Sequence, residues 1–415
     1  MPTAVLVMGC GLRSGHGRDQ IRLLHEQARR RGLDLIGAEK PANLSFADAS
    51  RFSALVPCEV EDAAAAAATM KSVDAEFAGV LAFRDLCVEP LAEVARTLGI
   101  PAISPAAART TRNKDLSRDR LREAGLPQPA AALVRDVAEA REFLDATPPG
   151  PWILKPRDGM GSAQVDLVRS AADLEQAFDG RPQGSPALIE EFVPGPEFSA
   201  DGVVVGGVPV ITALAQKSMG PSFVETGHRI PADLSDAQTA LVDAQMKVAL
   251  PAVGLTRGPF HVEFWTNGTG VVLGEIHARP GGAFIPTMAE YARPGLEMYG
   301  LYLDDVLGRP AQALPPTTRS AGMRHLIVRP PGRLASVSGW DEAVSVDQCV
   351  ASGLLVGPGD RIGPVTWSAD RHGFVVVEGA SGAEVDAGLD RIESGIGFEV
   401  TEEEPPGPVS SPPAP

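Results

Sequence analysis

Two short apolar segments that read as paired β-strands constrain the fold of this chain more than any other feature. Residues 258–264 and 270–277 each carry one acid, Glu263 and Glu275, and Asn267-Gly268 between them is a dipeptide typical of hairpin turns. The pattern predicts a β-hairpin with one carboxylate on each strand. Such a pair can face one side of a sheet and hold a hard cation through oxygen ligands.

Arg279 follows the second carboxylate of this hairpin by four residues. Its guanidinium is a planar, forked donor that suits the oxygens of phosphate or carboxylate groups. Two carboxylates followed by an arginine therefore suggest metal-assisted phosphoryl chemistry.

Length, charge and cysteine spacing limit the class of protein. The 415 residues exceed the usual size of one core, so we expect two or three domains. The net charge of −16, with no clustered basic surface, argues against a nucleic-acid partner. We see no leader peptide and no run of about 20 apolar residues, so we expect a cytoplasmic protein without a membrane partner. The cysteines lack the spacing of a zinc site or a disulfide framework: Cys10, Cys58, Cys87 and Cys349.

The chain divides into an α/β (α+β) fold of three domains. Alternating strand and helix patterns predict a parallel α/β domain at residues 1–108. Its expected strands are 4–8, 34–38 and 79–83, and its expected helices are 19–31, 63–68 and 88–98. A strand-rich central region, residues 109–310, follows and begins with a charged helix at 110–125. A β-rich carboxy-terminal domain is expected at 311–401, with strands at 324–328, 363–367 and 373–378, before a disordered tail at 402–415.

The glycines after the first strand invite a dinucleotide-binding interpretation. Gly9 and Gly11 fit its pattern, and Glu39 could contact a ribose, but Ser14 stands where the third glycine is needed. A strand-to-helix turn that requires glycine is therefore the better interpretation.

Lys155 ends an apolar strand and precedes a flexible turn that contains Gly161 and Ser162. One ammonium and several backbone N–H groups can surround a polyphosphate there, although the order of residues is not that of a Walker A loop. An exposed hairpin with an incidental lysine explains this segment equally well.

The segment 187–198 combines an acidic pair, Glu190-Glu191, with a Pro-Gly turn and Glu197. Backbone groups of such a linker can pair with an adenine edge, and Glu197 can accept hydrogen bonds from ribose hydroxyls. A solvated acidic turn is the simpler interpretation of this segment alone.

Glu225 and His228 lie three residues apart around a glycine. They could flank an ammonium group and a reacting carboxylate, or they could belong to a surface loop. His261 shares a strand with Glu263 and could either pack or support that carboxylate. The other histidines considered show no spacing signal and are expected to be surface or packing residues: His16, His25, His325 and His372.

Taken in order, these residues resemble the ATP-grasp superfamily of carboxylate–amine ligases, and within it the bacilysin-type L-amino acid ligases, similar to alanine–anticapsin ligase. The most specific parts are Glu225-Thr-Gly-His228, His261-Val-Glu263 and the run from Glu275 to Gly282. The resemblance covers nearly the whole chain and implies the three-domain ATP-grasp architecture, with a nucleotide lid at about 130–195.

The resemblance also implies a role for each residue. ATP and two magnesium ions, or manganese, would be the cofactors, and a homodimer is compatible with the resemblance. The nucleotide would contact Lys114, Lys155, Gly161, Ser162, Glu190, Glu191, Val193 and Glu197. The metal ligands would be Glu263, Glu275 and His277, although relatives usually have asparagine where His277 stands. Arg279 would hold the acyl phosphate, with Glu225 and His228 beside the first amino acid.

The implied reaction joins the carboxylate of one amino-acid-like substrate to the amine of another through an acyl phosphate, with release of ADP and phosphate. Another ATP-grasp activity, of the purine-pathway or carboxylase type, is the nearest alternative. A non-catalytic nucleotide-binding protein and an NAD-linked oxidoreductase are the others; the latter depends only on Gly9, Gly11 and Glu39.

Overall fold

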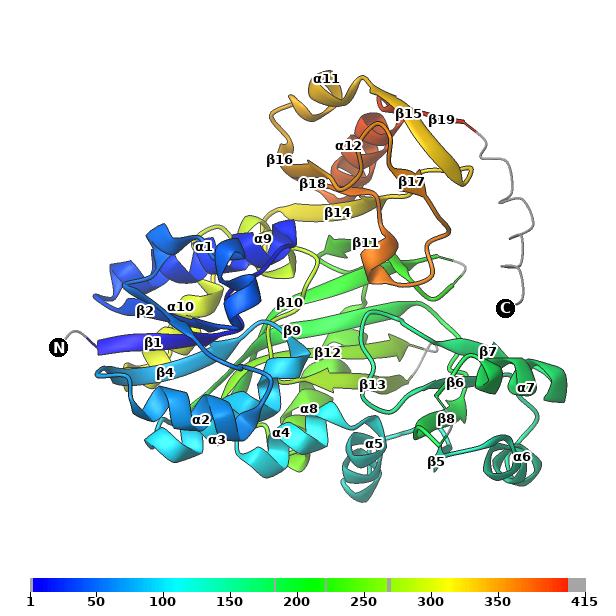
Figure 1. Ribbon diagram of the computed structural model, residues 1–415, viewed down its shortest axis with the longest axis horizontal. Coiled ribbons are helices and arrows are strands. Elements are labelled where there is room, and N and C mark those ends of the chain that lie inside the picture. The colour runs from blue at the N-terminus through cyan, green and yellow to red at the C-terminus, as the bar shows by residue number, and fades with distance from the viewer. Residues whose placement is uncertain (1–2, 183, 221, 267–269, 402–415) are drawn as a thin grey trace, which may run out of the picture.

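A computed structural model describes residues 3–182, 184–220, 222–266 and 270–401 of the protein. The amino-terminal sheet is parallel, with strands in the order β3-β2-β1-β4: β1 (Thr3–Met8), β2 (Asp34–Glu39), β3 (Ala54–Pro57) and β4 (Glu76–Ala82). Its helices are α1 (Gly15–Arg30), α2 (Ala63–Lys71) and α3 (Val88–Leu98) (Figure 1). Short 3-10 helices lie at Pro41–Phe46, Ala49–Arg51 and Asp85–Cys87. The predicted parallel α/β domain is confirmed.

The glycines after β1 form a turn that contacts Glu39 at the end of β2. Gly11 N donates to Glu39 Oε2 at 2.7 Å, and Arg84 Nη2 lies 2.9 Å from Glu39 Oε1. The Glu39 side chain is 0% exposed. Because this carboxylate already binds a backbone amide and an arginine, it is not available to a ribose, and the strand-to-helix interpretation holds.

The charged helix predicted at 110–125 does form over most of this stretch, but it is interrupted at Asn113, so that two helices occupy the stretch. They are α4 (Pro105–Arg112) and α5 (Lys114–Glu123). Asn113 between them is extended, with φ −106° and ψ 109°, and its side-chain amide donates to Arg109 O at 2.7 Å. Asparagine competes for backbone hydrogen bonds in this way, so it ends one helix and redirects the next.

A separate antiparallel sheet follows within the predicted lid. Its strand order is β5-β8-β6-β7, with β5 (Ala131–Val134), β6 (Trp152–Pro156), β7 (Asp166–Val168) and β8 (Ala187–Glu191). Helices α6 (Val137–Ala146) and α7 (Ala171–Asp179) pack on it around a small apolar core of its own. Figure 1 shows this sheet at the side of the molecule, away from the amino-terminal domain.

An eight-stranded sheet forms the centre of the protein, in the order β13-β12-β9-β10-β11-β14-β18-β16. Its central-region strands are β9 (Glu197–Val205), β10 (Val208–Met219), β11 (Glu225–Ile230), β12 (Gly258–Thr266) and β13 (Val271–His277). β12 and β13 pair antiparallel as predicted, while the turn expected at Asn267-Gly268 lies outside the described residues. Helix α8 (Asp236–Ala252) packs against this part of the sheet.

The carboxy-terminal region shares this central sheet. Its strands β14 (Ser320–Leu326), β16 (Cys349–Leu354) and β18 (Gly373–Gly379) continue the sheet from β11. A second, three-stranded sheet consists of β15 (Gly332–Ser338), β17 (Arg361–Ile362) and β19 (Gly397–Thr401), with helices α11 (Trp340–Val344) and α12 (Gly382–Ser394). The tail predicted at 402–415 lies outside the described residues.

The strand predicted at 363–367 is wrong. The backbone N–H groups of Thr366 and Trp367 donate to the Asp370 carboxylate at 2.8 and 3.1 Å. Asp370 ends a 3-10 helix, Ser368–Asp370, that begins directly after Trp367. An aspartate that binds the backbone a few residues earlier favours a local turn over a strand ladder.

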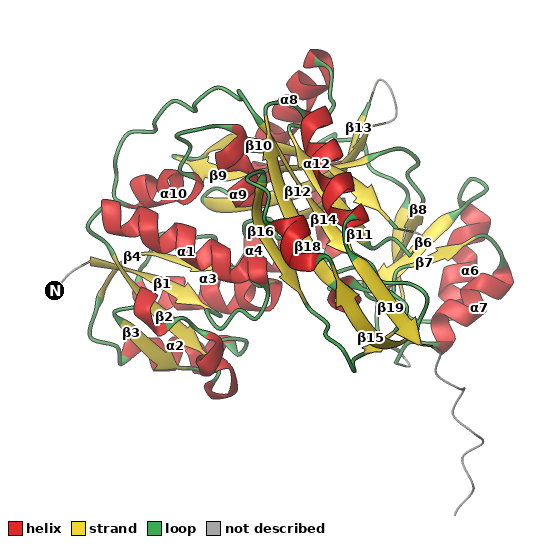
Figure 2. Cartoon of the chain, turned by 90° about the horizontal axis from the view of Figure 1, so that it is seen from above, coloured by secondary structure: helices red, strands yellow, loops and turns green. Residues whose placement is uncertain are grey.

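Two helices join the amino-terminal domain to the central sheet. They are α9 (Ile285–Ala292) and α10 (Met298–Val306), which pack against α1 (Figure 2). The Tyr302 hydroxyl of α10 donates to Val80 O and accepts from Val80 N, each at 2.8 Å. Arg31 pairs with Asp304 at 2.8 Å. These contacts fix the domain that supplies one side of the site described below.

A half-buried acid in α9, Glu290, predicts a pH-dependent stability. Burial raises the pKa of Glu290 to about 7, against hydrogen bonds from Met298 N and Gln27 Nε2. A folded-state pKa above the unfolded value contributes stability at low pH that is lost as pH rises toward 7. We expect Glu290→Gln to stabilise the protein by about 2 kcal/mol at pH 8 and by much less at pH 4.5.

Urea unfolding at the two pH values measures this effect, with the exposed Glu142→Gln as the control. Equal shifts of Glu290→Gln at both pH values would contradict it.

Two further expectations concern the cysteines and the helices. Cys10, Cys58, Cys87 and Cys349 are all free thiols, as predicted. Within the described ranges, the helices fall short of the length and apolar character that a bilayer crossing requires.

Candidate active site

The predicted hairpin places its two acids on one face of the central sheet. His261 of β12 lies opposite His277 of β13, and side chains two residues apart on a strand share a face. Glu263 and Glu275 therefore face the same side as the histidines. One potential ligand atom from each of Glu263, Glu275 and His277 lies within 4.8 Å of the others.

Asp85, from the amino-terminal domain, holds both His277 and Arg279. Its Oδ1 lies 3.0 Å from His277 Nδ1, and its Oδ2 lies 2.7 Å from Arg279 Nη2. Burial alone would raise the pKa of Asp85, but Arg279 and His277 hold it well below its usual range. With Nδ1 engaged, His277 turns Nε2 toward Glu275 Oε2, 3.5 Å away.

His261 supports Glu263 in a parallel arrangement. Its Nδ1 lies 2.7 Å from Asp201 Oδ1, and its Nε2 lies 3.5 Å from Glu263 Oε1. Although burial acts to lower it, Asp201 and Glu263 raise the pKa of His261 to about 9. Of the two roles left open by the sequence, the structure therefore favours support of the carboxylate.

Lys114 and Lys155, the predicted phosphate-binding lysines, converge on Glu275. Each ammonium lies 3.3 Å from one of its carboxylate oxygens. Lys155 also lies 2.7 Å from Glu190 Oε1, whose second oxygen is 3.0 Å from Arg118. The Glu190 side chain is thus occupied, and an adenine contact from this linker would have to use other atoms.

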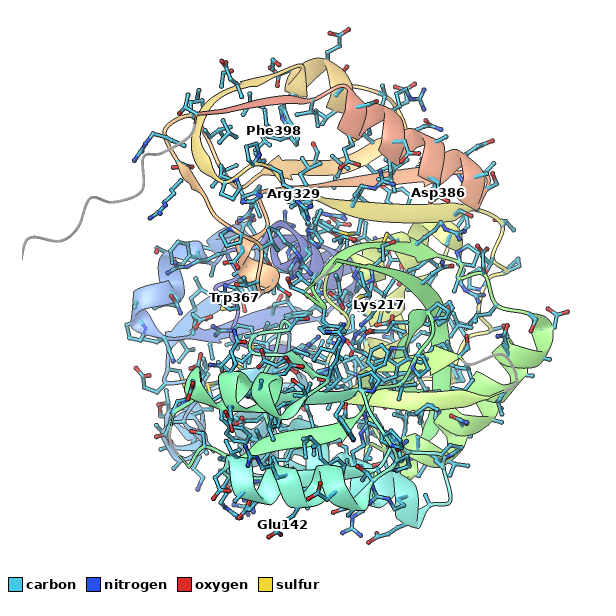
Figure 3. The ribbon with its side chains drawn as sticks, turned by 90° about the vertical axis from the view of Figure 1, so that its right-hand side faces the viewer. Glu142, Lys217, Arg329, Trp367, Asp386 and Phe398 are labelled. Carbon is cyan, nitrogen blue, oxygen red and sulfur yellow. The ribbon has the colours of Figure 1, made fainter. Side chains whose placement is uncertain are left out.

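Lys217 joins three carboxylates and was not predicted from the sequence. Its ammonium lies 2.6 Å from Glu197, 2.9 Å from Glu225 and 2.6 Å from Glu263. The side chain is 1% exposed and lies at the centre of the molecule, between the carboxy-terminal region and the lid sheet (Figure 3). One lysine cannot neutralise three acids, and burial raises the pKa of Glu197 to about 7.

Most residues predicted to contact nucleotide line a single cavity of about 120 Å³. They are Lys155, Ser162, Glu190, Glu191, Val193 and Glu197, and the acids Glu225, Glu263 and Glu275 share the lining. Lys114 borders a small adjacent space together with Lys155 and Glu275. The structure thus brings the lysines, the linker and the hairpin acids to one place.

The turn containing Gly161 and Ser162 contacts the carboxy-terminal region. Gly161 and Ser162 both have positive φ, 63° and 60°, and Gly161 O accepts hydrogen bonds from Ser368 N at 2.9 Å and Ser368 Oγ at 3.1 Å. This turn of the lid therefore touches the segment that lies above the site.

Glu225 and His228 belong to β11 rather than to a surface loop. The register of β10 and β11 shifts next to Glu225, and Glu225 Oε2 comes within 3.6 Å of His228 Nε2. Two cations also contact Glu225: Lys217 at 2.9 Å and Arg371 at 3.4 Å.

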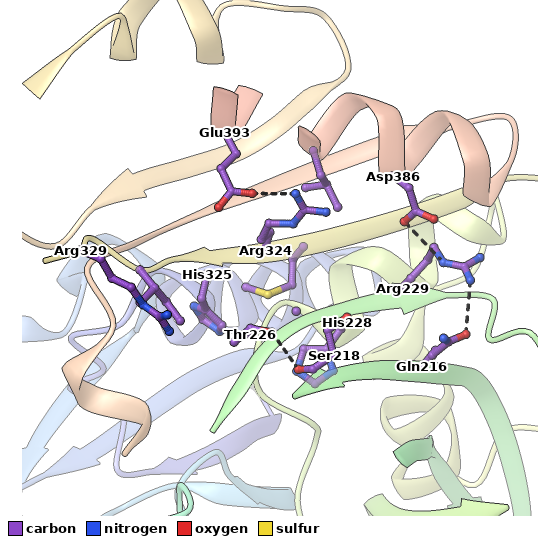
Figure 4. A pocket seen from close by; sticks show the side chains of 14 residues that line it. Gln216, Ser218, Thr226, His228, Arg229, Arg324, His325, Arg329, Asp386 and Glu393 are labelled. Carbon is purple, nitrogen blue, oxygen red and sulfur yellow. Dashed lines mark hydrogen bonds and ion pairs between the residues drawn. The ribbon is translucent and has the colours of Figure 1, made fainter. Parts of the chain in front are cut away.

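A larger cavity of about 550 Å³ lies between β11, β14 and α12, and His228 and His325 are among the residues that line it (Figure 4). Its charged groups are mostly used in local pairs. Arg229 contacts Asp386 at 3.6 Å, and Arg324 contacts Glu393 at 2.7 Å. The charged residues predicted to bind nucleotide and metal meet instead at the smaller cavity, which we take as the active site.

Comparison with known proteins agrees with this geometry. The family model described as an ATP-grasp domain matches residues 149–287, and the one described as L-amino acid ligase C-terminal domain 2 matches residues 324–401. The chain thus contains an ATP-grasp domain and an L-amino acid ligase C-terminal domain. The first match of this ATP-grasp protein covers the lid from β6 onward, the linker and the acid hairpin, and the second covers most of the strands that extend the central sheet.

Individual relatives share different portions of this ATP-grasp ligase. An uncharacterized protein of Sinorhizobium fredii is 28% identical, over 79% of this chain and 69% of its own length. Carnosine synthase 1 of Homo sapiens is 29% identical over 54% of this chain, which spans only 29% of that enzyme. The crystal structure of an L-amino acid ligase from Bacillus licheniformis superposes with a TM-score of 0.82 at 20% identity, over 96% of this chain and 99% of that one.

Proposed function

We propose that this protein joins the carboxylate of one amino acid, or amino-acid-like substrate, to the amine of a second through an acyl phosphate, releasing ADP and phosphate. The observation that carries the proposal is the convergence of Lys114 and Lys155 on Glu275 of the hairpin, beside a cavity that residues of the linker and the lid also line. The names of its relatives, an L-amino acid ligase and a carnosine synthase, support peptide-bond formation.

Three cationic side chains would bind the phosphate groups of the reaction. Lys114 and Lys155 would bind the ATP phosphates, and Arg279, fixed by Asp85, would hold the oxygens of the acyl phosphate. Attack by the substrate carboxylate on the terminal phosphorus replaces a poor leaving oxygen with phosphate, and the amine then expels that phosphate. Positioning and charge neutralisation supply most of the catalysis, since neither step needs a protein nucleophile.

The donor set around Glu275 fits a divalent cation. Glu263, Glu275 and His277 would hold it, and when bound it supplies charge neutralisation to the phosphoryl group. An imidazole whose other nitrogen is held by a carboxylate is an arrangement typical of metal-ligating histidines. Because manganese accepts an imidazole ligand more readily than magnesium does, we propose that manganese supports the reaction as well as magnesium.

Asp85→Asn should weaken metal binding by about 10- to 100-fold, because the imidazole of His277 loses its charged partner. Titration of Mn²⁺ by electron paramagnetic resonance, with a non-hydrolysable ATP analogue present, measures this affinity without turnover. The exposed Asp74→Asn in the same domain is the control. Unchanged manganese affinity in Asp85→Asn would contradict the role of Asp85 in supporting His277 as a ligand.

An ADP-release assay over all pairs from an amino acid library, with products identified by mass, tests the proposed function. We expect ADP formation that requires two amino acids and a dipeptide-sized product. ADP formation with bicarbonate instead would favour a carboxylase-type ligase. Failure of every pair and of bicarbonate would favour a non-catalytic nucleotide-binding protein.

We also propose amino acids as the small-molecule partners and the cytoplasm as the location, supported by the substrate-sized cavity and the free thiols. The homodimer stays a prediction.

A further inference from the structure

Arg371 is a buried arginine with unused hydrogen-bond donors. It lies between the 3-10 helix Ser368–Asp370 and β18, and it is 8% exposed. Its Nη2 is 3.4 Å from Glu225 Oε2, and its Nε has no hydrogen-bond partner among the described residues. A guanidinium carries five N–H donors and stays charged, so burial with one long contact is costly unless a ligand supplies acceptors.

Two buried histidines near Arg371 are equally short of partners. His228 is 4% exposed and His325 is 8% exposed, and neither ring nitrogen of either residue has a hydrogen-bond partner in the described part of the chain. Burial, with Arg371 and His228 adding to it, lowers the pKa of His325 well below its usual range. A neutral imidazole there can donate a hydrogen bond without adding charge.

The strand register places these groups together beside the proposed active site. β11 pairs with β14 so that His228 lies opposite Met323, and His325 is therefore its diagonal neighbour on the same face. Lys217 lies opposite His228 on the other side and contacts Glu225. Figure 4 shows His325 on the side of β14 away from Arg324, which turns toward α12.

A fourth residue, His16 of the amino-terminal domain, lies close enough to interact electrostatically with His325 and Arg371. Burial first, and then Arg279 and Arg371, lower the pKa of His16 to about 4. The cluster of Arg371, His325, His228 and His16 thus draws on all three regions of the chain. It adjoins Arg279, which we place at the acyl phosphate.

We propose that Arg371, assisted by His325, binds a substrate carboxylate other than the one that ATP activates. This inference rests on the proposed function. When two amino acids are joined, one carboxylate reacts and at least one remains, either the α-carboxylate of the acceptor or a side-chain carboxylate of the donor. A planar guanidinium can donate two parallel hydrogen bonds to such a group.

A purely structural tie between Arg371 and Glu225 explains less. The 3.4 Å contact is long for a charge-assisted hydrogen bond, and Glu225 already has Lys217 at 2.9 Å. Such a tie also leaves the buried Nε of Arg371 and both ring nitrogens of His325 without hydrogen-bond partners among the described residues.

Arg371→Gln tests the proposal, with Arg324→Gln as the matched control because Arg324 lies in the same region and pairs with Asp390 and Glu393. Each active pair is compared as acid and as amide: alanine with alaninamide as acceptor, and aspartate with asparagine as donor. We expect KM of the carboxylate-bearing substrate to rise about 10- to 100-fold while KM of its amide stays unchanged. His325→Gln should act in the same direction with a smaller effect.

The comparison also identifies the source of the carboxylate. An effect confined to the acceptor pair assigns Arg371 to the α-carboxylate, and an effect confined to the donor pair assigns it to the side chain. Equal changes for acid and amide, or no change, would overturn the proposal.

A binding measurement separates this inference from the proposed function. If the wild-type protein forms no ADP with any pair, the function fails, and calorimetry with a non-hydrolysable ATP analogue still decides the role of Arg371. Binding of alanine or aspartate over its amide that is lost in Arg371→Gln supports the inference. No preference of the wild-type protein for either acid overturns it.

Discussion

Glu275→Gln is expected to reduce amino-acid-dependent ADP formation by about a thousandfold or more. Glu275 meets both Lys114 and Lys155 and lies within ligand distance of Glu263 and His277. The substitution removes one negative charge from the proposed cation site, which is worth several kcal/mol of transition-state stabilisation, and about 1.4 kcal/mol is a factor of ten in rate.

The fold should survive this change, because Lys155 keeps Glu190 at 2.7 Å and Lys114 keeps its hydrogen bond to Gly159 O at 2.8 Å. Glu378→Gln is the matched control, since Glu378 lies on the same sheet, is also 20% exposed and is remote from the site. Near-normal turnover of Glu275→Gln, with unchanged thermal unfolding in both variants, would refute the assignment of Glu275.

Lys217→Met is expected to destabilise the folded protein by about 3–5 kcal/mol at pH 8. Its removal leaves Glu197, Glu225 and Glu263 buried together without their shared cation, and breaking a buried ion pair from one side typically costs this much. Urea unfolding measures the loss. Lys247→Met, which removes an exposed lysine paired with Asp243, is the control and should change stability little.

Divalent cations give this prediction a second readout. One oxygen from each of Glu197, Glu225 and Glu263 lies within 4.8 Å of the others, a spacing suited to metal ligation. Calcium should therefore stabilise Lys217→Met more than it stabilises the wild-type protein. Equal stabilisation of the two proteins would contradict electrostatic repulsion among the three acids as the cause of the lost stability.

The sequence predicted the elements whose signals are local. The apolar run of β1 and the amphipathic pattern of α3 depend on neighbouring residues, and both elements form where expected. The predictions failed at Asn113 and at 363–367, where side chains bind nearby backbone groups and override the periodicity. Periodicity does not register such competition.

The sequence predicted site candidates that share a motif, and it missed residues that only tertiary structure brings beside them. Glu263, Glu275 and Arg279 share one short segment, whereas Asp85 lies far from His277 in the sequence and reaches it only through domain packing. Lys217 is a lone lysine in an apolar strand, and that polar exception was an available signal. Arg371 and His325 gave no signal, because their significance lies in the partners they lack.

The hydrogen bonds between Gly161 and Ser368 connect two binding events that use different parts of the chain. A nucleotide that holds the lid turn in this position also restrains the segment that carries Arg371, three residues after Ser368. Linkage is reciprocal, so the factor by which ATP raises the affinity for the amino acid is the factor by which the amino acid raises the affinity for ATP. Binding of each substrate would then favour retention of the other.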